Sequence, residues 1–281
     1  MKVGFALLFW LVSAGAGLAA EPLRVAVSIA PQAWLVEAVG GPEVEVLTVL
    51  RPGSNAATFS PPPSVLRKLG RQAVYFAIGV PFEQAWLPAL RKAMPGLRIV
   101  ALQQGLVRIE GVAHAGHAHD FDPHVWTSVA NLRRMAARIR DELIHLRPSE
   151  STRFTANWRM LDERLKQLDT ELRERLAPHR GAAFMVFHPA WGYFARDYGL
   201  RQIVIEPFGK QVGPRRLMRL IERARRERIA VVFVQPQFSE RQARLIADAI
   251  GGRVTRLDPL AHDIAATLRR AARAFANEAR R

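Results

Sequence analysis

The sequence predicts an α/β protein made of two βα lobes with parallel sheets, joined by one long rigid helix. Short β-branched runs alternate with helical stretches in the first half of the 281-residue chain, and the same alternation returns in the second half. One helical pattern much longer than usual separates the two halves. Strands that alternate with helices form βαβ units and hence parallel sheets. We therefore expect a first lobe at 21–147, a linking helix at 148–178 and a second lobe at 179–281.

The first twenty residues have the pattern of a secretory signal peptide, which we place at 1–20. Lys2 precedes the apolar run 3–12, and small residues follow up to Ala20. The apolar run is too short to span a bilayer convincingly, which disfavours the alternative of an uncleaved anchor. We expect cleavage near Ala19 or Ala20 and a mature protein in the periplasm.

The first lobe is expected to contain four strands with helices between them. The β-branched runs lie at 24–29, 44–49, 74–78 and 98–101. A helix at 128–146 closes this half, because its apolar residues recur every three or four positions. These are Leu132, Met135, Ile139, Leu143 and Leu146.

The linking helix carries the strongest periodic pattern of the chain. Pro148 marks its start and Pro178 its end. The heptad-like spacing is also compatible with a coiled coil, but the run is short for one, so we expect it to pack along the protein's own body. Its apolar stripe consists of Phe154, Trp158, Leu161, Leu165, Leu168, Leu172 and Leu176.

The second lobe repeats the alternation of strands and helices. The expected strands are 183–187, 202–205, 230–234 and 253–257. Helical spacing appears at 214–226, 240–250 and 263–278.

The charge and cysteine content restrict the possible functions. The net charge is +16, but the arginines are interleaved with acids, as in Asp162-Glu163-Arg164, which is typical of solvated helix faces. We therefore expect no nucleic-acid partner, although an anionic membrane surface or an acidic partner remains compatible with the composition. The chain contains no cysteine, so a transition-metal site must use His, Asp and Glu.

Three side chains of metal-ligand type lie in loops or just after expected strands. His124 occurs in Asp122-Pro-His-Val-Trp126, His188 follows the strand at 183–187, and Asp258 follows the strand at 253–257. The carboxyl ends of parallel strands form the crevice in which α/β proteins bind ligands. These groups could therefore converge on one cleft, although each of them alone could simply stabilise a turn.

Several motifs, taken in order, resemble the periplasmic zinc and manganese binding proteins of ABC transporters. They are Arg51-Pro-Gly-Ser-Asn-Ala-Ala-Thr-Phe-Ser-Pro-Pro-Pro-Ser64, Asp122-Pro-His-Val-Trp126, Phe187-His-Pro-Ala-Trp-Gly-Tyr193, Ile205-Glu-Pro, Val234-Gln-Pro-Gln-Phe-Ser239 and Leu257-Asp-Pro-Leu260. The resemblance covers essentially the whole mature chain. It implies a metal cleft between the lobes and docking onto an inner-membrane ABC permease, and we expect a monomer.

The resemblance places His124, His188 and Asp258 on three of the four ligand positions of the family. The first position departs from the family, because Ala57 stands where members typically have a histidine. Four protein ligands close a tetrahedral site, whereas three leave an open position.

A short histidine run precedes His124 and matches the place of a histidine-rich loop in zinc-binding members of the family. It contains His114, His117 and His119. His119 or a neighbour could replace the missing ligand, or the run could be a reduced version of a capture loop. A solvated loop without a metal role is equally compatible with the sequence.

Zinc is the leading candidate metal, because two imidazoles and one carboxylate suit it better than calcium or magnesium. Manganese, copper and nickel remain possible, and protons should compete with any of them for imidazole. We expect a binding protein without catalytic residues. A zinc hydrolase is one alternative, but Glu206 is a candidate base by its type alone. A degenerate paralogue that binds another solute, a metal chelate or a protein partner is the other, and Ala57 is its main support.

Overall fold

The computed structural model describes residues 21–110, 121–206 and 212–278 of the chain. The first lobe contains the strands β1 (Leu23–Val27), β2 (Val44–Thr48), β3 (Val74–Ala77) and β4 (Arg98–Ala101). They form a parallel sheet in the order β2-β1-β3-β4. All four residues of β3 are buried, which is why its sequence is continuously apolar rather than alternating.

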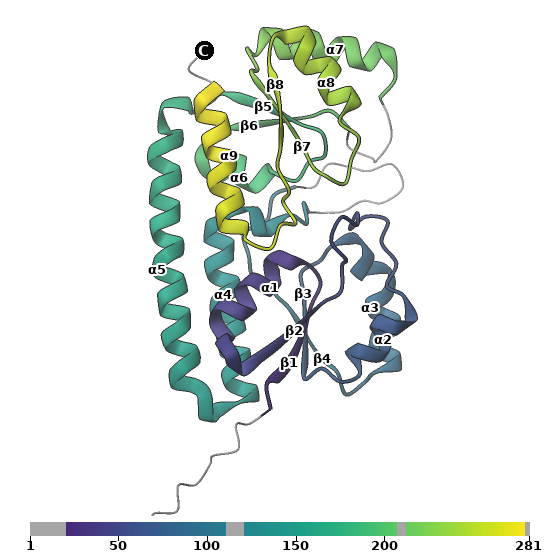
Figure 1. Cartoon of the computed structure of the whole chain (residues 1–281), viewed down its shortest axis with the longest axis vertical. Coiled ribbons are helices and arrows are strands. Elements are labelled where there is room, and N and C mark those ends of the chain that lie inside the picture. Colours follow the sequence, from purple (N-terminus) through teal and green to yellow (C-terminus); the bar gives the residue numbers. More distant parts are fainter. Residues whose placement is uncertain (1–20, 111–120, 207–211, 279–281) are drawn as a thin grey trace, which may run out of the picture.

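Helices cover both faces of this first sheet. The helices α1 (Ala30–Gly40) and α4 (Val129–Leu146) lie on one side, and α2 (Pro63–Leu69) and α3 (Pro81–Ala93) lie on the other (Figure 1). Ser128 caps α4, because its side chain accepts a hydrogen bond from the backbone N–H of Asn131. This cap fixes the start of α4 close to His124.

The second lobe repeats the topology of the first. Its strands are β5 (Ala183–Val186), β6 (Arg201–Val204), β7 (Val231–Val234) and β8 (Arg253–Arg256), in the parallel order β6-β5-β7-β8. Its helices are α6 (Gly192–Tyr198), α7 (Pro214–Arg226), α8 (Arg241–Ile250) and α9 (Ile264–Glu278). In each sheet the first connection leads to one side of the first strand, and the next connection leads to its other side. The place where these two connections part is the switch point at which such sheets bind ligands.

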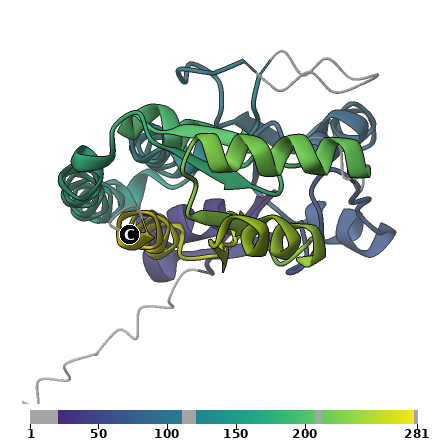
Figure 2. The same ribbon diagram turned by 90° about the horizontal axis from the view of Figure 1, so that it is seen from above.

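The helix α5 (Ser151–Leu176) runs alongside both lobes (Figures 1 and 2). Its 26 residues extend over about 39 Å at 1.5 Å per residue. The expected apolar stripe is buried except for Trp158, which is half-buried. The helix packs against α1, α4 and α9, so it lies along the protein's own body as expected.

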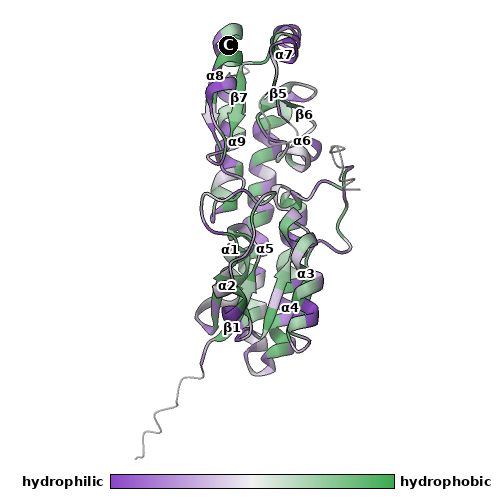
Figure 3. Ribbon diagram, turned by 90° about the vertical axis from the view of Figure 1, so that its right-hand side faces the viewer, coloured by the Kyte–Doolittle hydropathy of each residue, from purple (hydrophilic) through white to green (hydrophobic). Residues whose placement is uncertain are grey.

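The two lobes share part of their hydrophobic core. One cluster of buried residues includes Val25 and Phe76 of the first lobe and Phe184 and Phe233 of the second, together with residues of α5 and α9. Figure 3 shows hydrophobic and hydrophilic residues alternating along the helices, as expected when one helix face covers a sheet.

The predicted fold class is confirmed. Each observed strand begins and ends within one residue of its predicted range, except that β1 ends two residues earlier than predicted. The lobe boundaries at 147 and 179 stay a prediction. The proposed signal peptide and the histidines at 114, 117 and 119 lie outside the described residues. Within the parts of the chain that the structure describes, none of the helices has the length and apolarity needed to span a bilayer.

Candidate metal centre

A cavity of about 200 Å³ lies between the two lobes. Its walls come mainly from the segments that follow β2, β3, β5, β7 and β8 and from the loop before α4. The carboxyl ends of both sheets therefore meet at this cavity. The lining includes Asn55, Ala56, Ala57, Val80, Pro81, Phe121, Asp122, Pro123, His124, Trp126, His188, Pro189, Gln235, Gln237, Phe238, Pro259 and Leu260.

Two of the three predicted ligands are neighbours in this cavity. The ring centroids of His124 and His188 are 5.3 Å apart, with an angle of 76° between the ring planes. His124 lies directly before the short helical turn Val125–Thr127, and His188 lies two residues after the end of β5. The two imidazoles thus approach each other from segments that are far apart in the sequence.

Asp122 orients the ring of His124. Its Oδ1 accepts hydrogen bonds from the backbone N–H of His124, at 2.8 Å, and from Nδ1 of the same residue, at 2.7 Å. A histidine that donates one ring N–H to a carboxylate presents the other nitrogen to a metal. The pair therefore leaves Nε2 of His124 as the nitrogen for a ligand.

Tyr193 holds the loop that carries Asp122. Its hydroxyl donates to the backbone carbonyl of Asp122 at 2.8 Å. Burial raises the pKa of Tyr193 to about 12, so the hydroxyl keeps the proton that it donates. Because Tyr193 belongs to α6 in the second lobe, this hydrogen bond joins the second lobe to the loop before α4.

Gly192 allows α6 to approach Asp122 closely. A Cβ atom at this position would lie 2.8 Å from Oδ2 of Asp122 and 2.8 Å from Cδ1 of Ile109. Real Cβ contacts are essentially never that short, so any other residue would displace one of these neighbours. The glycine in Phe187-His-Pro-Ala-Trp-Gly-Tyr193 therefore leaves room for the carboxylate of Asp122 in its observed position.

His188 is positioned by side chains that follow β7. The amide of Gln235 accepts from the backbone N–H of His188 at 3.3 Å and donates to its carbonyl at 3.0 Å. The ring of Phe238 stacks on the imidazole, with centroids 5.2 Å apart and an angle of 24° between the planes. These contacts fix His188 from the backbone and from one face of its ring.

Asp258 lies beside the cavity and is held by two donors. Its Oδ1 accepts from Nε2 of Gln237 at 3.0 Å and from the backbone N–H of Leu260 at 2.9 Å. Among the residues that the structure describes, no three His, Asp or Glu side chains form a group that could hold a metal. The two imidazoles are therefore adjacent, but Asp258 does not join them in a three-residue metal-binding group. The full ligand set stays a prediction.

Ala57 lines the same cavity as the two imidazoles. Its backbone N–H donates to Oδ1 of Asn55 at 2.8 Å, which forms a tight turn in the loop after β2. A methyl group thus borders the cavity where the resemblance predicts a histidine. Glu206 is buried and does not belong to the described lining of the cavity.

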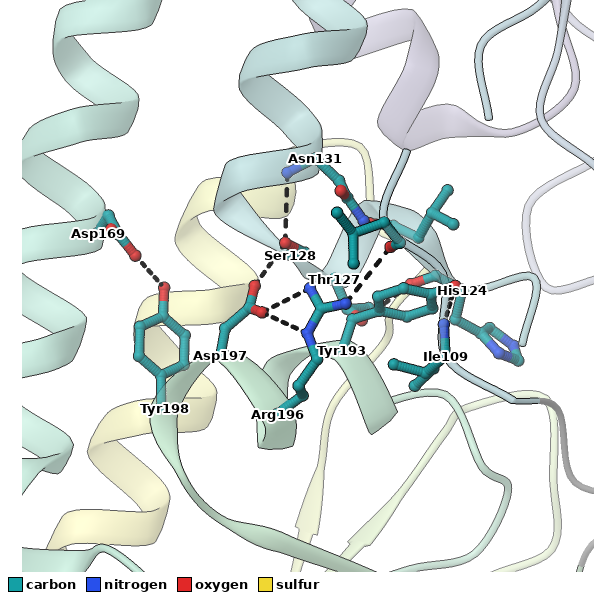
Figure 4. A network of polar contacts seen from close by, with 12 residues as sticks. Ile109, His124, Thr127, Ser128, Asn131, Asp169, Tyr193, Arg196, Asp197 and Tyr198 are labelled. Atoms are coloured by element: carbon teal, nitrogen blue, oxygen red, sulfur yellow. Dashed lines mark hydrogen bonds and ion pairs between the residues drawn. The ribbon is translucent and has the colours of Figure 1, made fainter. Parts of the chain in front are cut away.

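A polar network around α6 fixes how the lobes meet (Figure 4). The hydroxyl of Ser128, the cap of α4, donates to Asp197, and the hydroxyl of Tyr198 donates to Asp169 of α5 at 2.9 Å. Burial raises the pKa of Tyr198 well above its ordinary value. The indole N–H of Trp126 also donates to the carbonyl of Pro259 at 2.7 Å, so both sides of the cavity are cross-connected.

Comparisons with known proteins identify the family and agree with the fold. The chain matches the model of a family described as zinc-uptake complex component A, periplasmic (ZnuA), over residues 25–275. A crystal structure of a ZnuA is 35% identical and superimposes with a TM-score of 0.85, covering 92% of this chain and 99% of that one.

Two curated proteins show more distant similarity. A putative metal-binding protein of Treponema pallidum is 28% identical over 249 residues, which is 83% of this chain and 78% of that protein. The zinc-binding protein AdcA of Streptococcus pyogenes is 25% identical over 265 residues. That match covers 86% of this chain, and the chain spans about half the length of AdcA, 51%.

Proposed function

Since the chain belongs to the ZnuA family of periplasmic metal-binding receptors, we propose that it captures zinc and delivers it to the permease of an ABC importer. The main support for this proposal is the pair of imidazoles in the interlobe cavity, whose ring centroids are 5.3 Å apart. Neutral imidazole together with carboxylate is a donor set that suits zinc.

The proposed ligands are His124, His188 and Asp258. Asp122 would orient the imidazole of His124, and Gln235 would hold the backbone of His188. Gln237 would orient the carboxylate of Asp258. Metal ligands are generally held by such hydrogen bonds. Bringing Asp258 to the two imidazoles requires a local adjustment of its side chain or of the loop after β8.

The family consists of solute-binding receptors rather than enzymes. Membership of this family implies that the partner of the protein is a membrane permease. We place the mature protein in the periplasm as a monomer, in keeping with the signal-like sequence at its start.

Zinc binding to the metal-free mature protein, measured by competition with a chromophoric chelator, tests the proposed site. His124→Ala, His188→Ala and Asp258→Ala should each weaken binding, because each removes a donor atom. His145→Ala is the matched control, since His145 is exposed on α4 away from the cavity. Loss of binding in the control as well, or full affinity in the His188 variant, would refute this ligand set.

A further inference from the structure

We propose that the metal is bound together with a small chelating anion, which occupies the space beside Ala57 and supplies the missing donor atoms. This inference rests on the proposed function. The anion would be of the size and type of an amino acid or a hydroxycarboxylate, with one carboxylate and a neighbouring amine or hydroxyl that bind the same ion.

The size of the cavity is the first observation. Its volume is about 200 Å³, whereas a protein cavity of about 150 Å³ already accommodates a molecule the size of benzene. A metal ion held directly by protein side chains needs far less room. The remaining space is large enough for an organic ligand of a few heavy atoms.

The donor set is the second observation. Zinc takes four ligands in a closed site, and a site with three protein ligands keeps a position for an external group. Here Ala57 contributes a methyl group to the cavity wall, and the described residues hold no group of three acidic or imidazole side chains around a common point. At least one coordination position is therefore left for an atom that the described side chains do not supply.

The nature of the walls is the third observation. They include Val80, Pro81, Phe238 and Leu260, and the nearby carboxylates accept hydrogen bonds, Asp122 from His124 and Asp258 from Gln237. The observed position of Asp258 does not bring its carboxylate into a group with the two imidazoles. An anionic chelator lowers the net charge of the complex, and its carbon atoms can contact the apolar walls.

Native mass spectrometry of the metal-free mature protein tests this inference. The probes are zinc alone and zinc with an equimolar amount of L-histidine. We expect the second mixture to yield protein carrying one zinc and one histidine, and His188→Ala to lose this adduct. Protein that carries zinc without histidine in both mixtures would overturn the inference and leave the proposed function standing. Protein that binds zinc in neither mixture would instead refute the proposed function.

Two substitutions at one position separate space from donor atoms. Ala57→Leu fills the space without adding a donor and should abolish the histidine adduct. Ala57→His adds the donor and should bind zinc alone more tightly than the unchanged protein does. Thermal unfolding of both metal-free variants checks that they fold. A histidine adduct that persists in the folded Ala57→Leu protein would contradict the proposed location of the anion.

Discussion

Asp122 should contribute to metal affinity although it need not touch the metal. Its Oδ1 accepts from Nδ1 of His124 at 2.7 Å, and a hydrogen bond to a charged acceptor is worth about 1.5–3 kcal/mol. Without it, the imidazole must adopt the correct tautomer and orientation when the metal binds. Because about 1.4 kcal/mol corresponds to a tenfold change in affinity, Asp122→Ala should weaken zinc binding by roughly 10- to 100-fold.

Asp122→Asn separates orientation from charge. The amide oxygen still accepts from Nδ1, so this variant should fall between the unchanged protein and Asp122→Ala. Chelator competition at constant pH gives the affinities, and Asp141→Ala on the exposed side of α4 serves as the control. If the folded Asp122→Ala protein binds zinc as tightly as the control does, then His124 is not oriented for the metal by Asp122.

Three further predictions concern stability and packing. Burial raises the pKa of Glu83, so the folded protein keeps this proton to higher pH than the unfolded chain. The protonated side chain of Glu83 therefore contributes to the free energy of unfolding below pH 4.5, the ordinary pKa of this group, and the contribution is lost as the pH rises through the raised pKa. In denaturant titrations at several pH values, metal-free Glu83→Gln should lack this pH-dependent contribution. Gly192→Ala should weaken zinc binding by displacing Asp122, whereas Gly96→Ala, where a Cβ meets nothing within 4 Å, should not; equal affinities would show that the close approach is dispensable. Leu168→Ala removes a fully buried side chain of α5 and should lower the free energy of unfolding by about 2–5 kcal/mol, and a loss below about 0.5 kcal/mol would contradict its place in the core.

The fold was predictable because its local signals agree with one another. The strands β3, β5 and β7 are continuously apolar, as required for parallel strands covered on both faces. The spacing of apolar residues in α5 matches its buried stripe. The prediction of alternating strands and helices gave no bounds for the short helix α6, because its seven residues are too few for a helical period to stand out.

The candidate site was predictable only in part. Strand ends and motifs indicated that His124 and His188 could meet in one cleft, and the structure places them together. The roles of Asp122 and Gly192 depend on contacts between segments some 70 residues apart, which spacing within one segment does not report. Both residues stand in the quoted motifs, but the motifs did not indicate which contacts these residues make. The position of Asp258 relative to the imidazoles likewise depends on its hydrogen bond with Gln237.

The shared core of the two lobes has a consequence for how the protein unfolds. Because α5 and α9 pack within a cluster that contains residues of both sheets, neither lobe can lose its structure without exposing apolar surface of the other. The lobes should therefore melt together as one cooperative unit, with equal calorimetric and van't Hoff enthalpies. Ligand binding at the interlobe cavity would then stabilise the whole chain, since the site exists only while both lobes are folded.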